Sequence, residues 1–322
     1  MPYLTGTVAS ATALRSIVEQ AGIDAGYTLA SGVLSKGDSH IKLTAPSTNE
    51  LRIESARDAA FTLPAPGFAR IADDGWPATY HLFRFANPDM VMVVLVAAGT
   101  RHQHLGFGVI GEKVGAWTGG EWFSASKSGV AYNAAGLVSI PIILKGEFFS
   151  TIVGDGTLFS GEPVPFWASL TPGPAMSGSY LFANITGKQS GWSTAIITPS
   201  SDGIATGGFT HFVQATPGFL PLLQRQPNAW NAEPVLLPWN LNMLRDQAKV
   251  SRLGALSHLR ALRIDNLGSG DIITLGLDRW MVFPASRKNS VDRDGWVGGT
   301  AAATQSTAHT GTFGWAIRYD GP

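Results

Sequence analysis

The stretch Met90-Val-Met-Val-Val-Leu-Val-Ala-Ala98, followed by His104-Leu-Gly-Phe-Gly-Val-Ile-Gly-Glu-Lys-Val-Gly-Ala-Trp-Thr-Gly-Gly120, decides the fold. The first part is a run of apolar and mostly β-branched residues, which favours a strand. The second part contains Gly-x-Gly-x-x-Gly at Gly106, Gly108 and Gly111, which is the spacing of a dinucleotide-binding loop. The fold and one candidate function both depend on what these glycines do.

A dinucleotide-binding loop needs its third glycine to open a helix, whose first amides hold the pyrophosphate. After Gly111, three more glycines and the residues Trp117 and Trp122 interrupt any helix of three turns. We therefore expect the glycines to permit positive φ angles and close backbone approach in a β-bulge or turn, with Phe107 and the two tryptophans packed around them. No nucleotide cofactor is expected.

Strand patterns dominate the chain from Tyr80 onward and are separated by Gly, Pro, Asn and Ser. Near the C-terminus, residues 312–319 alternate strictly, with Phe313, Trp315, Ile317 and Tyr319 on one face. These patterns predict a mainly β fold, with an antiparallel β-sandwich as the main domain.

Residues 1–66 predict a small α+β unit at the N-terminus. A helix is expected within residues 9–29, capped by Ser10 or Thr12 and followed by short strands. The proline-rich stretch at residues 63–67 marks the end of this unit. The β-rich main domain is expected to span residues 75–322.

The charge and composition of the chain restrict the classes of partner that it can bind. Lys plus Arg and Asp plus Glu balance at 23 each, so no positive field draws the protein to nucleic acid or to an anionic membrane. Only 14% of the residues are charged, whereas soluble domains carry about 25%. A surface with few ions is easier to bury permanently against other subunits, because less desolvation is needed. Assembly with other chains is expected.

The chain has no cysteine, so disulfides and thiolate chemistry are excluded. Its N-terminus lacks the features of a signal peptide, and its longest apolar run, residues 90–98, is about half the length of a membrane-spanning helix. We expect a cytosolic origin and no membrane.

Three histidines are candidate metal ligands. His102 and His104 alternate along a predicted strand, so both imidazoles could face one side and bind Zn or another metal. His81 could join them from a neighbouring strand, but no nearby Asp or Glu completes the set. Ordinary hydrogen-bonded histidines are the favoured interpretation, and no metal is predicted.

Other polar motifs are weak as catalytic sites. Asp292 and Asp294 begin like a calcium loop, but the later oxygen ligands are missing. Asp73 and Asp74 precede a glycine and predict a turn rather than a pair of glycosidase carboxylates. Ser257-His258 has no identifiable acid to orient the histidine. We therefore predict no catalytic residues and no enzyme activity.

Two blocks of the sequence resemble virion structural proteins of tailed bacteriophages, which are usually described only as structural or tail-associated. The first comprises residues 80–83, 87–89 and 104–120, and the second comprises residues 225–238 and 258–322. The most specific segments are Gly270-Asp-Ile-Ile-Thr-Leu-Gly, Arg279-Trp-Met-Val-Phe-Pro, Arg287-Lys and His309-Thr-Gly-Thr-Phe-Gly-Trp-Ala-Ile-Arg-Tyr-Asp-Gly-Pro322. Residues 125–215 match nothing in this family and could carry a host-specific or phage-specific loop.

The resemblance implies a non-enzymatic component of a phage tail, baseplate or head-to-tail junction. Such a protein would be made in the bacterial cytoplasm and assemble as a symmetric oligomer with other virion proteins. The exposed edge of the last strand, or Tyr3–Val8, could pair with neighbouring copies by strand addition. The alternative is a tail-tip module that binds host surface glycan through Trp167, Tyr180 and Trp192. A glycan depolymerase is the weaker third hypothesis.

Overall fold

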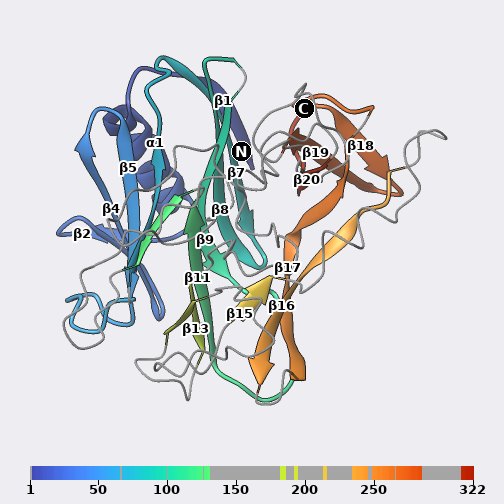
Figure 1. Ribbon diagram of the computed structural model, residues 1–322. Coiled ribbons are helices and arrows are strands. Elements are labelled where there is room, and N and C mark those ends of the chain that lie inside the picture. Colours follow the sequence, from blue (N-terminus) through green and yellow to red (C-terminus); the bar gives the residue numbers. More distant parts are fainter. Residues whose placement is uncertain are drawn as a thin grey trace, which may run out of the picture.

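The computed structural model shows a mainly β protein with one helix in its described part (Figure 1). It describes residues 2–130 except 66, 100 and 126, residues 234–284 except 246–248 and 265, residues 313–322, and the short segments 182–185, 192–194 and 213–215. The described strands form three antiparallel sheets, which we call sheets A, B and C. The prediction of a mainly β, antiparallel fold is confirmed.

Sheet A is the central layer. Its strand order is β1 (Tyr3–Val8), β7 (Ala78–Ala86), β8 (Asp89–Ala97), β9 (Arg101–Val109), β11 (Gly119–Ala125), β13 (Phe182–Ile185) and β14 (Trp192–Thr194).

Sheet B lies on one side of sheet A. Its strand order is β12 (Lys127–Val130), β6 (Gly67–Ala72), β5 (Glu50–Ala56), β4 (Ser39–Ser47), β3 (Val33–Lys36) and β2 (Thr28–Ala30).

Sheet C lies on the other side of sheet A. Its strand order is β15 (Val213–Ala215), β16 (Leu237–Arg245), β17 (Lys249–Arg263), β20 (Phe313–Arg318), β19 (Asp278–Pro284) and β18 (Ile272–Leu275), and β10 (Glu112–Lys113) pairs with β17.

The apolar run in β8 is explained by burial on both faces of sheet A. Successive side chains of a strand point to opposite faces. Met90, Met92 and Val94 accordingly join the core shared with sheet C, whereas Val91 and Val93 join the core shared with sheet B. A strand between two cores has no solvent face, so its sequence shows no alternation of apolar and polar residues.

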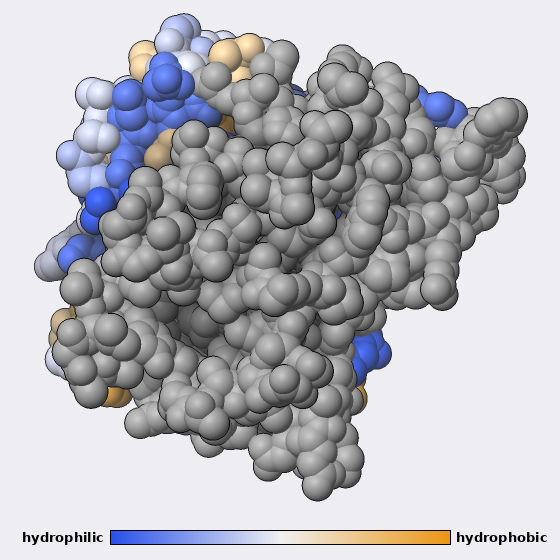
Figure 2. All heavy atoms as spheres, viewed as in Figure 1, coloured by the Kyte–Doolittle hydropathy of each residue, from blue (hydrophilic) through white to orange (hydrophobic). Residues whose placement is uncertain are grey.

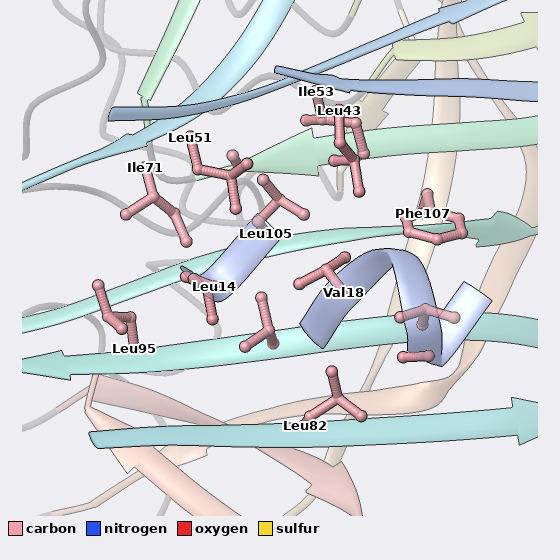
Figure 3. Packing of buried hydrophobic residues seen from close by; sticks show 14 of the residues in the cluster. Leu14, Val18, Leu43, Leu51, Ile53, Ile71, Leu82, Leu95, Leu105 and Phe107 are labelled. Carbon is pink, nitrogen blue, oxygen red and sulfur yellow. The ribbon is translucent and has the colours of Figure 1, made fainter. Parts of the chain in front are cut away.

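The helix α1 (Ala11–Asp24) fills the space between sheets A and B. Its N-cap is Ser10, whose side chain accepts a hydrogen bond from the amide of Ala13 at 3.2 Å, so of the two predicted caps, Ser10 and Thr12, the structure selects the first. Figure 3 shows Leu14 and Val18 pointing into the cluster between the side chains of the two sheets. Both side chains are completely buried, so α1 is a component of this core.

The core between sheets A and C has a different composition. Aromatic side chains from both sheets meet there, including Phe83 of β7, Phe283 of β19 and Trp315 of β20. The ring centroids of Phe283 and Trp315 lie 5.5 Å apart, and those of Phe83 and Phe283 lie 6.1 Å apart in an edge-on arrangement. Such aromatic contacts stabilise the core beyond the stabilisation that comes from burying apolar area.

The N-terminal residues share their core and sheets with later parts of the chain. β1 pairs with β7 in sheet A, and β6 continues the sheet that contains β5. One apolar cluster contains residues of α1, sheet B and sheet A. The predicted unit at residues 1–66 therefore contributes to two of the three layers.

The sequence predicted that the last strand has an exposed edge, and the structure corrects this prediction. β20 lies inside sheet C, paired with β17 on one side and with β19 on the other. The predicted alternation holds, since Trp315 and Ile317 face the core shared with sheet A and Ala316 belongs to a cluster on the opposite face. Both edges of β20 are therefore used within the chain.

The surface of the described N-terminal part is mostly hydrophilic in one view. Figure 2 shows blue and pale residues mixed with small orange areas at the upper left, where Figure 1 shows β4, β5 and α1. Among the described residues, no helix combines the length and the apolar character that crossing a membrane requires.

Candidate functional site: the edge of sheet A at β1

β1 is the edge strand of sheet A and carries the surface that we regard as the candidate site. It pairs with β7 from Tyr3 opposite Phe83 to Val8 opposite Ala78. In the strand order of sheet A, no described strand lies on its other side. An edge strand presents a row of unpaired backbone groups, which is a template for pairing with another strand.

The direction of each backbone group of β1 follows from one hydrogen bond. The amide of Arg84 donates to the carbonyl oxygen of Pro2 at 2.7 Å. Because hydrogen-bonded and non-hydrogen-bonded pairs alternate in an antiparallel ladder, the N–H and C=O groups of Tyr3, Thr5 and Thr7 point away from β7. Within the described residues, these outward groups have no backbone partner.

The side chains of β1 divide between the two faces of sheet A. Tyr3 packs toward sheet C, where its ring lies 5.0 Å from that of Tyr319 and its hydroxyl group lies 2.8 Å from Nδ1 of His81. Leu4 points to the opposite face and is 46% exposed. β1 carries no Lys, Arg, Asp or Glu.

A groove of about 410 Å³ runs beside Leu4, between β1, β7 and the second half of α1. Its apolar lining comes from Leu4, Ile17, Ala21 and Leu82. Its polar lining comes from Ser16, Gln20, Asp24 and Arg84. A peptide strand added to β1 would therefore find hydrogen-bonding groups on the edge and an apolar groove on one face of it, as in recognition by β-strand addition.

One end of the groove holds an ion pair. Asp24 at the end of α1 pairs with Arg84 of β7 and also accepts a hydrogen bond from Gln20 at 2.8 Å. The Gln20 hydrogen bond, together with the guanidinium of Arg84, lowers the pKa of the Asp24 carboxyl group. The carboxylate therefore stays charged and paired at neutral pH.

The glycines of the Gly-x-Gly-x-x-Gly motif lie where the chain passes from sheet A to sheet C. Gly106 and Gly108 belong to β9 of sheet A, and the next strand, β10, pairs with β17 of sheet C. A Cβ atom at Gly108 would collide with the carbonyl oxygen of Asp89, and one at Gly111 would collide with Pro88. The expected close approach is confirmed.

The expected positive φ angles are found at other glycines of the stretch. Gly115, Gly119 and Gly120 have positive φ angles, whereas Gly106, Gly108 and Gly111 do not. Gly106, Gly108 and Gly111 are therefore required because a side chain would not fit at these positions, and not because of their backbone conformation. The register of β11 against β13 shifts between Gly119 and Trp122, so the irregularity also lies later than expected.

The three candidate histidine ligands all point toward sheet C, each into a different contact. Nε2 of His102 lies 2.8 Å from the hydroxyl group of Ser269, and the ring of His104 lies 5.9 Å from that of Trp315. His81 is bonded to Tyr3 and is separated from His104 by Val94 of β8. Among the described residues, no three potential ligand side chains gather as they would around a metal ion.

Burial changes the proton affinity of these histidines. Loss of hydration lowers the pKa of His104 to about 3 and lowers the pKa of His81. Both imidazoles are therefore neutral at pH 7.

Ser257 and His258 are neighbours on β17, so their side chains point to opposite faces of the strand. The His258 ring stacks on Phe85 with centroids 4.0 Å apart, and its Nε2 donates to the carbonyl oxygen of Asn87 at 3.1 Å. Burial lowers the pKa of His258. This histidine joins sheet C to the turn between β7 and β8.

The turn predicted at Asp73 and Asp74 is confirmed. One carboxylate oxygen of Asp73 accepts from the amide of Gly75 at 2.8 Å, and the other accepts from Nε2 of Gln103 at 2.6 Å. The indole of Trp76 donates to the carbonyl oxygen of Asp73 at 2.7 Å. Asp73 thus holds the loop before β7 in place.

Several sequence candidates lie outside the described residues. These are Asp292, Asp294, Trp167 and Tyr180, and of Trp192 only the backbone, in β14, is described. Most of the unmatched segment at residues 125–215 is likewise outside them.

Sequence reasoning identified Tyr3–Val8 as a strand available for pairing but missed the groove beside it. The signal was available in part, since Ile17 and Ala21 lie four residues apart in the sequence and so share one face of the helix. Their neighbourhood to Leu4 depends on how α1 crosses sheet A, which no local pattern specifies. Comparisons of the chain with models of protein families and with curated proteins found no match.

Proposed function

We propose that this chain is a non-enzymatic structural component of a tailed-bacteriophage virion that assembles as a symmetric oligomer. Its place would be the tail, the baseplate or the head-to-tail junction, and it would be made in the bacterial cytoplasm. The observation that carries the proposal is the uncharged edge strand β1, with outward backbone groups and an apolar groove beside it.

Two further features support an assembly role. The chain has few charged residues and zero formal net charge, so large parts of its surface can be buried at little electrostatic cost. The resemblance of its two sequence blocks to virion structural proteins supports a tailed-bacteriophage virion as the assembly that contains it. Partners in this proposal are other virion proteins and further copies of the chain.

Mass spectrometry of purified virions tests the proposal directly. We expect the chain to be present in intact, washed particles at a fixed ratio to the other structural proteins. Particles made without the gene should lack tails or fail to join tail to head. Infectious, fully assembled particles that contain none of this chain would contradict the proposal, and binding of host polysaccharide by the purified protein would favour the receptor-binding alternative.

A further inference from the structure

We propose that β1 is the surface at which two copies of this chain join, edge to edge, about a twofold axis at Thr5. Sheet A of one copy would continue directly into sheet A of the other. The inference deepens the proposed function and rests on it in one respect only, the expectation that the chain assembles with itself.

The register follows from the backbone groups that point outward. A partner strand must pair with the N–H and C=O groups of Tyr3, Thr5 and Thr7. When two copies are antiparallel and the axis lies at Thr5, Thr5 faces Thr5 of the second copy, and Tyr3 faces Thr7 of the second copy. This register gives all three outward residues a partner in both copies. A shift by one residue would place them opposite residues whose backbone groups point away, and a shift by two residues would leave an end pair without a partner.

The side chains of β1 fit the same register. On the groove side, the half-exposed Leu4 lies opposite Gly6 of the second copy, which has no side chain to obstruct it. The Leu4 side chains of the two copies then lie diagonally across the axis, within contact range for long side chains. On the other face, Thr5 meets Thr5, a cross-strand pair that stabilises antiparallel strands.

The charges at this edge do not oppose a second copy. Soluble proteins usually protect an edge strand with Lys, Pro or a bulge, and β1 has none of these. Asp24 and Arg84, at the end of the groove, are already paired with each other. Because the formal net charge is zero, two copies also meet without overall repulsion.

Light scattering on the purified full-length protein tests the inference. The wild type is expected to be a dimer, or a larger even-numbered assembly built from dimers. Thr5→Lys and Thr5→Glu each place two like charges opposite one another, so each variant alone should weaken the dimer at least about tenfold. An equimolar mixture of the two variants should restore dimers, because opposite charges then face each other. Only the Thr5-to-Thr5 register predicts this restoration.

Proline variants provide a matched control for folding. Thr5→Pro removes an outward N–H and the hydroxyl group that donates to the carbonyl oxygen of Tyr80 at 2.8 Å, so the monomer should keep most of its thermal stability and lose dimerisation. Gly6→Pro removes an N–H that is directed at β7, so it should lower the stability of the monomer itself.

Three results would overturn the inference. The first is a wild type that is monomeric at about 100 µM, far above the Kd of a specific interface. The second is an oligomer unaffected by Thr5→Lys, and the third is an equimolar mixture of Thr5→Lys and Thr5→Glu that does not restore dimers. A monomer that is nevertheless present in virions would overturn this inference alone. A dimer absent from virions would overturn the proposed function alone.

Discussion

The two faces of sheet A differ in chemistry, although the same strands supply both. The face toward α1 and sheet B is covered mainly by aliphatic side chains such as Leu14, Leu95 and Leu105. The face toward sheet C carries Trp122 and the buried or half-buried histidines His81, His102 and His104, and sheet C places Trp315 and His258 against this face. One layer of strands therefore separates a core with little ionisable content from one that holds several imidazoles.

This difference predicts where acid acts on the molecule. Burial lowers the folded-state pKa of His81, His104 and His258 below the usual 6.5, so the unfolded chain binds more protons than the folded chain as the pH falls. Their contribution to stability is complete above about pH 6.5 and is lost progressively below it. The contact between sheets A and C should therefore weaken first in acid.

The largest expected effect breaks the crowded backbone on the sheet C face. Gly108→Ala would place a Cβ atom against the carbonyl oxygen of Asp89 and within 2.9 Å of the Cα atom of Met90. Because backbone atoms cannot move aside easily, we expect a loss of at least about 3 kcal/mol in the free energy of unfolding. Urea denaturation measures it.

Gly106→Ala is the matched control for this prediction. Its Cβ atom would collide with Sδ of the flexible Met92 side chain and would lie 3.1 Å from the nearest backbone atom, the carbonyl oxygen of Val91, so the loss should be smaller, about 1–3 kcal/mol. Equal losses at the two positions would show that the collision with backbone is not the cause.

The next effect compares the two cores directly. Leu14→Ala opens a cavity in the core with sheet B, and Leu259→Ala opens one in the core with sheet C. Both side chains are fully buried, so each substitution should cost about 2–5 kcal/mol at pH 7.5. Urea denaturation should give similar losses, and a loss below about 1 kcal/mol at either site would argue against that packing.

The histidine effect sharpens the comparison, because it depends on pH. For His104, whose pKa falls to about 3, stability should decrease by up to about 1.4 kcal/mol per pH unit between pH 6 and pH 4. His104→Gln cannot take up this proton, so the slope of stability against pH should fall by about one proton, whatever the cost at pH 7.5. Leu14→Ala, as the control, should keep the wild-type slope. An unchanged slope in His104→Gln would contradict the prediction.

The smallest effect lies at the start of α1. Ser10→Ala removes the hydroxyl group that accepts from the Ala13 amide, at an expected cost of about 1 kcal/mol. Ser10→Asp should restore most of it, because aspartate is also a good N-cap. Thermal melts of the three proteins test the order, and a melting temperature for Ser10→Ala equal to that of the wild type would exclude a capping role.

Local patterns were sufficient to predict the mainly β class, the helix with a cap at Ser10 or Thr12, and the alternation of β20. These features depend on side chains within a few residues of one another, so the sequence shows them directly. The sequence predicted an exposed edge for the last strand, whereas β20 lies between β17 and β19. That prediction was wrong because pairing between distant strands leaves no local signal. The groove beside Leu4 was missed for the same reason, since it requires the crossing of α1 over β1 and β7.

The position of β20 in its sheet also has a consequence during translation. Among the described strands it is the last to leave the ribosome, yet it lies between β17 and β19, which precede it. Sheet C cannot close before β20 has been synthesised, so Phe83, Met92 and Trp122 remain uncovered on the nascent chain until then. Slow synthesis or premature termination would therefore prolong the exposure of an aggregation-prone apolar face of sheet A. Chaperones that bind unfolded polypeptides would then be needed most by incomplete chains.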